Sequence, residues 1–86
     1  MEKGMYKYES MALIIKDYLS SLNTPIAQLT ALDARKLPGM DQYASNSCYD
    51  NVARAMDHVG NTYFKGRALN EEKRGSSTFT YEYHLK

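Results

Sequence analysis

The chain has 86 residues and a formal net charge of +1, with 43% hydrophobic and 24% charged residues. This length predicts one hydrophobic core and one domain, and the balance of apolar and charged residues excludes an intrinsically disordered chain. The low net charge gives no general attraction to nucleic acid, so binding of that kind requires a local patch. A core this small leaves a stability margin of roughly 5 kcal/mol, which is compatible with burying a surface in a homodimer or a complex.

The cysteine content and the N-terminal residues indicate the compartment. Cys48 is the single cysteine and cannot form an internal disulfide, whereas small secreted domains normally carry several. The segment from Met1 to Met5 lacks the apolar run of a signal peptide, and no stretch is long and apolar enough to cross a bilayer. We therefore expect a cytoplasmic protein without a membrane segment.

The first periodic segment indicates a helix. Apolar residues recur there at steps of three and four, so they fall on one helical face. Asn23 is a favourable residue to end this helix, and Pro25 is tolerated in the first turn of a new element. The sequence predicts an N-terminal arm over residues 1–8 and a helix over residues 9–23. The residues of its apolar face are Met11, Ile14, Ile15, Tyr18 and Leu22.

Residues 25–37 allow two interpretations. In the first, which we favour, they form a single second helix. In the second, residues 26–30 are extended, and Thr30 then caps a helix with Asp33 three residues further on, as in a capping box. In both interpretations Pro38-Gly39 ends the helix, because proline and glycine interrupt helical structure.

The third helix has the clearest boundaries. Ser47 offers an N-cap oxygen, Asp50 suits the positive end of the helix dipole, and Gly60 with Asn61 provides a left-handed stop. The sequence therefore predicts a helix over residues 47–59. Its apolar stripe consists of Tyr49, Val52, Met56 and Val59, and its polar residues are left for solvent or a partner.

From Thr62 the apolar period changes from about 3.6 to 2, which indicates strands. We expect strands over residues 62–69 and 78–85, joined by a loop into a hairpin. One register pairs Phe64 with Tyr83 and Lys65 with Glu82, and a shift by two residues in either direction preserves both faces. In each case the core side carries Phe64, Ala68, Phe79, Tyr81 and Tyr83, and the outer side carries Lys65 and Arg67.

The sequence lacks the residue patterns of common active sites. Cys48 and His58 are separated by about 15 Å along one helix, so they cannot share a site. No phosphate-binding glycine loop, metalloprotease motif or zinc spacing occurs. We expect a protein that is not an enzyme and that has no metal and no cofactor.

The order of three helices and a two-stranded hairpin, with residues 47–60 as the third helix and the break that follows it, resembles the winged helix-turn-helix family. The resemblance covers residues 9–86. It implies an α+β fold in which a three-helix bundle carries a C-terminal two-stranded β-hairpin, the wing. It also implies that the protein binds double-stranded DNA.

The resemblance also implies roles for individual residues. The N-terminal half of the third helix would enter the major groove, where asparagine reads adenine and arginine reads guanine. The hairpin cations would contact backbone phosphates or the minor groove. The recognition-helix residues are then Ser45, Asn46, Ser47, Asp50, Asn51 and Arg54, and the wing residues are Lys65, Arg67, Lys73 and Arg74.

The charges leave a second interpretation open. Asp50 and Arg54 are spaced to form an intrahelical ion pair, Asp57 adds a further negative charge, and the loop tip is charge-neutral. Eight tyrosines are an excess for this length and are favoured at interfaces, or as half-buried core. We therefore expect a small bacterial or phage transcriptional regulator, with a winged-helix-like protein interaction module, such as a phage-encoded inhibitor or adaptor that binds a host protein, as the alternative.

Overall fold

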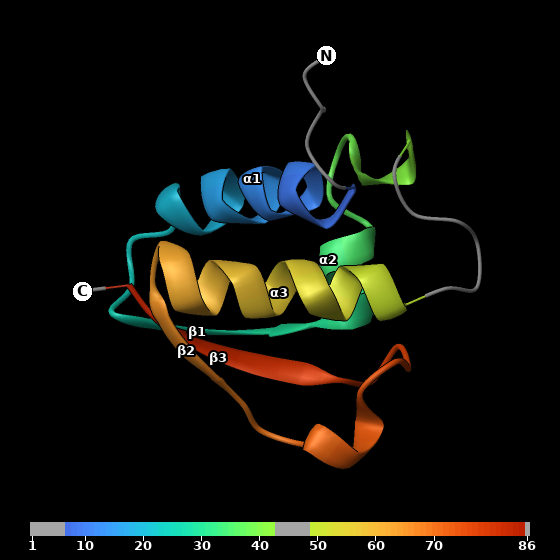
Figure 1. Ribbon diagram of the computed structural model, residues 1–86. Helices are drawn as coiled ribbons and strands as arrows, with labels where there is room; N and C mark the ends of the chain where they lie inside the picture. Colours follow the sequence, from blue (N-terminus) through green and yellow to red (C-terminus); the bar gives the residue numbers. More distant parts are fainter. Residues whose placement is uncertain (1–6, 43–48, 86) are drawn as a thin grey trace.

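The computed structural model describes residues 7–42 and 49–85. In these ranges the chain forms a mixed α+β fold, as predicted, and Figure 1 shows α3 between α1 and the sheet. The strands form one antiparallel sheet in the order β1-β3-β2, so the sheet has three strands where the sequence predicted two. The elements are α1 (Lys7–Ser20), β1 (Ile26–Thr30), α2 (Ala31–Arg35), η1 (Met40–Gln42), α3 (Asp50–Thr62), β2 (Lys65–Ala68), η2 (Glu71–Lys73) and β3 (Thr80–His84).

The segment after α1 shows that the favoured prediction of a single helix over residues 25–37 is wrong. Ile26–Thr30 is strand β1, and only Ala31–Arg35 is α-helical. Thr30 is the N-cap of α2, and its hydroxyl oxygen accepts a hydrogen bond from the backbone N–H of Asp33 at 3.0 Å. The second interpretation, with an extended segment and a Thr30 cap, is therefore confirmed.

Pairing with β3 explains why this segment is a strand. All five β1 residues lie opposite residues of β3, and Leu29 is buried there. The pairing continues into α2, because the N–H of Ala31 donates to the carbonyl of Phe79 at 2.7 Å. These contacts pair the backbone groups of β1 that face β3 and bury its apolar side, which outweighs a weak local preference for helix.

The two long helices are shifted from their predicted bounds. The first was expected over residues 9–23 and spans Lys7–Ser20, while the third was expected over residues 47–59 and spans Asp50–Thr62. Gly60 does not end α3. It lies inside the helix, which continues to Thr62, and is buried against the ring of Tyr81. The predicted cap, Ser47, lies outside the described residues.

The hairpin is confirmed, with shorter strands and a different register. The strands predicted over residues 62–69 and 78–85 span Lys65–Ala68 and Thr80–His84. Lys65 lies opposite His84 and Arg67 lies opposite Glu82, a shift of two residues from the predicted pairing of Lys65 with Glu82. Because the side chains of a strand alternate with a period of two, this shift leaves both faces unchanged.

The core lies between the two long helices and the inner face of the sheet. Phe79, Tyr81 and Tyr83 are buried as predicted, whereas Phe64 and Ala68 are only partly buried at its margin. From the helices, the largest fully buried side chains are Met11, Ile15, Leu19, Val52, Met56 and Val59.

Two tyrosines of β3 join the sheet to α3. The rings of Tyr81 and Tyr83 stack, with their centroids 4.9 Å apart. The Tyr83 hydroxyl donates a hydrogen bond to the carbonyl of Met56 in α3 at 2.8 Å, which satisfies a buried polar group. Tyr81 lies against Gly60 of α3 and Gly66 of β2, where side chains would leave its ring no room. These tyrosines are therefore core residues.

The contact between Gly60 and Tyr81 predicts the sign of a mutation. A Cβ at Gly60 would lie 2.7 Å from Cε1 of Tyr81, closer than real contacts allow. Alanine favours a helix over glycine by about 1 kcal/mol, but overpacking a core costs about 1–3 kcal/mol. We expect Gly60→Ala to lower the free energy of unfolding measured with urea. In a Tyr81→Ala background the same change should be stabilising, and a stabilising effect in the native background would contradict the packing argument.

The buried tyrosines also predict instability at alkaline pH. Burial, with the nearby Asp57 carboxylate, raises the pKa of Tyr81 to about 12, and burial also raises the pKa of Tyr83 above its ordinary value. An unfolded tyrosine deprotonates near pH 10, so the free energy of unfolding is retained below about pH 10 and falls as the pH rises toward 12. Urea titrations across this range should show a smaller alkaline loss in Tyr81→Phe and Tyr83→Phe, and an equal loss would contradict the assignment.

Candidate functional site

The polar side of α3 forms an open face. Val52, Met56 and Val59 are fully buried, whereas Asp50 and Arg54 are exposed, which agrees with the predicted division of the helix. The ion pairs between described residues do not include the Asp50–Arg54 pair that the spacing allows.

A shallow pocket of about 300 Å³ lies on this face of α3. Three of its lining residues are Arg54, Asn61 and Tyr8, the last from α1. Asp57 and His58 also line it, and the ring centroid of His58 lies 5.9 Å from that of Tyr8 and 6.0 Å from that of Tyr63, both edge-on. The pocket therefore combines a guanidinium, an amide and aromatic edges with the carboxylate of Asp57, so charges of both signs line it.

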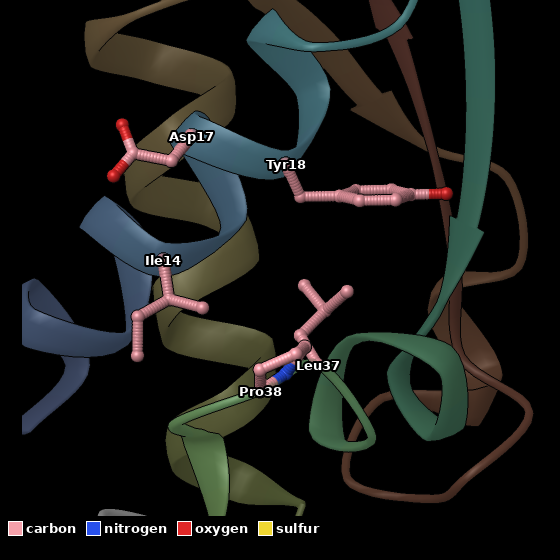
Figure 2. A pocket seen from close by; sticks show the side chains of 5 residues that line it. All are labelled: Ile14, Asp17, Tyr18, Leu37 and Pro38. Carbon is pink, nitrogen blue, oxygen red and sulfur yellow. The ribbon is translucent and has the colours of Figure 1, made fainter.

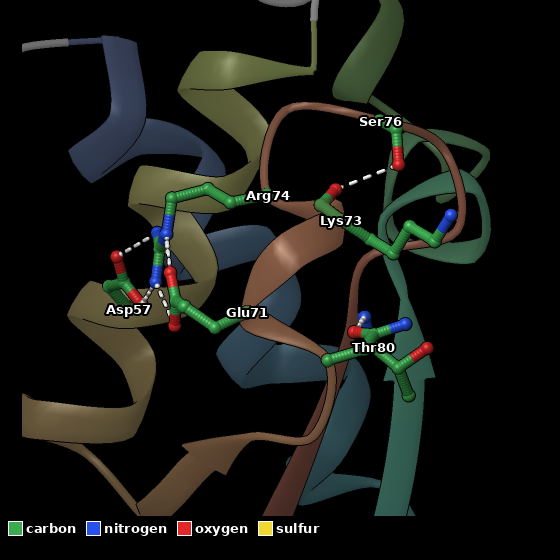
Figure 3. A network of polar contacts seen from close by, with 7 residues as sticks. Asp57, Glu71, Lys73, Arg74, Ser76 and Thr80 are labelled. Carbon is green, nitrogen blue, oxygen red and sulfur yellow. Dashed lines mark hydrogen bonds and ion pairs between the residues drawn. The ribbon is translucent and has the colours of Figure 1, made fainter.

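The loop between β2 and β3 is fastened to α3 by Arg74 (Figure 3). Its guanidinium donates to both carboxylate oxygens of Asp57, at 2.5 and 3.2 Å, and to both carboxylate oxygens of Glu71. It also lies 4.8 Å from the ring centre of Phe79. The hydrogen bonds that Arg74 donates to Glu71, and then those to Asp57, raise the pKa of Arg74, and the bond to Glu71 lowers the pKa of that carboxyl. We call Arg74, Asp57 and Glu71 the arginine clamp.

Other bonds fix the base of the same loop. The Asn70 side chain accepts from the N–H of Thr80 at 2.7 Å and donates to the carbonyl of Thr78 at 2.9 Å. Gly75 adopts a φ of +91°, and a Cβ there would lie 2.9 Å from a carboxylate oxygen of Asp50. The loop therefore lies beside the N-terminal half of α3.

The structure divides the four predicted wing cations into two groups. Lys73 and Arg74 belong to the loop beside α3, whereas Lys65 and Arg67 project from the outer face of the sheet, the face opposite to Tyr81 and Tyr83. One DNA segment lying along the open face of α3 therefore cannot use all four in the same way.

On that outer face three polar side chains contact the carboxylate of Glu82. Arg67 Nε lies 3.4 Å from Glu82 Oε1, while Gln28 Nε2 and His84 Nε2 each lie 3.5 Å from its carboxylate. Burial raises the pKa of Glu82, but hydrogen bonds from Arg67 and Gln28 outweigh it and lower the pKa below its ordinary value. Arg67 therefore pairs with Glu82, and Lys65, which was predicted to do so, lies opposite His84.

Three predicted site residues lie outside the described part of the chain, and one ion pair of the site was not predicted. Ser45, Asn46 and Ser47 were predicted as recognition-helix residues and lie outside the described residues. The ion pair of Asp57 with Arg74 was not predicted, because the two residues are distant in sequence. The spacing of Glu71 and Arg74, three residues apart in a short helix, was a signal for the other half of the clamp.

A second, apolar pocket lies between α1 and the segment after α2 (Figure 2). It has a volume of about 360 Å³, and Tyr18, expected in the core, lines it and is 38% exposed. The other lining residues are Ile14, Asp17, Leu37 and Pro38.

Comparison with protein-family models, with curated proteins and with solved structures finds no match to this chain. Among residues 7–42 and 49–85, no group of three or more His, Cys, Asp or Glu side chains could hold a metal ion. No helix in the same ranges has the length and apolar character needed to span a membrane.

The arginine clamp predicts the dynamics of the loop. Arg74→Ala removes the ion pair that links the tip of this loop to α3, so we expect faster amide hydrogen exchange over residues 71–76, measured by NMR. Lys73→Ala removes a neighbouring cation that is not part of the clamp, and it should leave exchange in the loop unchanged. Equal protection in the two variants would contradict a fastening role for Arg74.

Proposed function

We propose that this protein is a winged-helix DNA-binding transcriptional regulator, in which α3 reads the major groove and the β2–β3 hairpin is the wing. The arrangement of its elements carries this proposal: three helices precede a C-terminal hairpin, and the hairpin loop lies beside the N-terminal half of the third helix. Helix and loop could therefore meet a DNA duplex from one side.

The side chains of α3 support the same proposal. Arg54 is exposed and Asn51 is partly exposed on the open face, and these residue types read guanine and adenine through paired hydrogen bonds. On the loop, Lys73 is exposed and suits a backbone phosphate. Arg54 and Asn51 would then supply sequence preference, and Lys73 would supply affinity.

The charges of this face predict weak binding by one copy of the chain. Asp50, Asp57, Glu71 and Glu72 accompany Arg54, Lys73 and Arg74, so few phosphates would be neutralised. A homodimer on a two-fold symmetric site would double the contacts, and we propose that the regulator binds DNA in that form.

A fluorescence titration with genomic DNA fragments at several salt concentrations tests the proposal. We expect salt-dependent binding, with Arg54→Ala reducing the preference for the best fragment by about 1–3 kcal/mol. Lys73→Ala should weaken binding to all fragments, whereas Lys65→Ala, the same change on the outer face of the sheet, should leave it unaltered. Absence of binding at low salt would overturn the proposal.

The alternative is a protein interaction module that binds a host protein. It is favoured by the four carboxylates of α3 and the neighbouring loop, and by the apolar pocket with the exposed Tyr18. This function predicts stoichiometric capture of one protein that resists nuclease, is lost in Tyr18→Asp and persists in Arg54→Ala. Capture that nuclease abolishes would count against it.

A further inference from the structure

Arg74 has the chemistry of a phosphate-binding residue, but carboxylates occupy its donors. Asp57 bonds two of its nitrogens, and Glu71 bonds two as well (Figure 3). Carboxylates and phosphates are both recognised by the planar guanidinium through paired hydrogen bonds. The clamp therefore engages the same donors that a DNA phosphate would need.

Exposure makes these carboxylates replaceable. The side chains of Arg74, Asp57 and Glu71 are 37%, 33% and 63% exposed. Water screens ion pairs with this access, and a phosphate offers the guanidinium the same paired hydrogen bonds as a carboxylate, so an incoming phosphate can replace a carboxylate. The ring of Phe79 packs against the guanidinium from another side, so Arg74 keeps a support when a carboxylate leaves.

We propose that Asp57 and Glu71 compete with DNA phosphates for Arg74, so that Arg74 exchanges its carboxylate partners for a backbone phosphate when the protein binds DNA. This inference rests on the proposed DNA-binding function. No covalent step is involved, because one set of charge-assisted hydrogen bonds replaces another.

The exchange has a consequence for selectivity. Phosphate contacts supply nearly all of non-specific DNA binding, so a clamped arginine reduces binding to the wrong sequences. A site that also satisfies Asn51 and Arg54 provides the additional free energy that moves Arg74 from the carboxylates to the phosphate. The two acids thus act against unwanted partners, a recognised route to specificity.

Three neutralising variants test the exchange by DNA titration over a range of salt concentrations. Asp57→Asn and Glu71→Gln each weaken the clamp, and Glu72→Gln is the matched control, because it makes the same charge change outside the ion pairs of Arg74. We expect Asp57→Asn and Glu71→Gln to tighten DNA binding by about two- to fivefold more than the control, the range of a surface ion pair. The salt slope should steepen by about 0.9 when both are combined, as one more phosphate is neutralised.

Removing Arg74 shows whether the tighter DNA binding of these variants depends on Arg74. When Asp57→Asn is combined with Arg74→Ala, the gain in DNA affinity should disappear. If the gain persists, it comes from the change in net charge alone, and the proposed exchange is wrong. Equal gains in Asp57→Asn and the Glu72→Gln control would overturn it too. Circular dichroism checks folding, and Glu71→Gln decides the question if Asp57→Asn does not fold. Binding by the native protein without any gain refutes the exchange alone, whereas no binding by any variant refutes the proposed function as well.

Discussion

The pairing of β3 with strands on both of its edges is the constraint on which the other contacts of this domain depend. One edge of β3 pairs with β1, which lies between the first two helices in the chain, and the other edge pairs with β2 to form the hairpin. Its inward side chains then join the sheet to α3 through the Tyr83 hydrogen bond and the contact of Tyr81 with Gly60. The position of α3, and of the loop that accompanies it, follows from this central strand.

The sequence could predict the elements whose signals are local. The amphipathic period of α3 and the alternation along β3 each lie within one segment, and both elements were predicted. Strand β1 was assigned to a helix because its conformation is set by β3, which is distant in sequence. The hairpin register was ambiguous by two residues because the period of a strand is itself two. The partnership of Arg74 with Asp57 joins separate elements, so no local pattern could indicate it, whereas Glu71 lies at helical spacing.

On the outer face of the sheet, Lys65 and Arg67 can stabilise the sheet without contacting DNA. Strand β2 is an edge strand, and charged side chains on an edge discourage pairing with strands of other molecules. Arg67 also pairs with Glu82 of the central strand, which stabilises the register across the hairpin. These two cations therefore have a structural explanation, whereas Lys73 and Arg74 lie where a ligand of α3 would meet them.

The backbone N–H groups of the first turn of α2 are all bonded to acceptors of the same chain. The N–H of Ala31 donates to the carbonyl of Phe79, the N–H of Leu32 donates to the carbonyl of Ser77 at 3.0 Å, and the N–H of Asp33 donates to the Thr30 hydroxyl. A helix end with free N–H groups can hold a phosphate, but here these three donors are already engaged. In the proposed complex with DNA, the first turn of α2 would therefore support the chain that enters β3, and other groups would have to bind the phosphates.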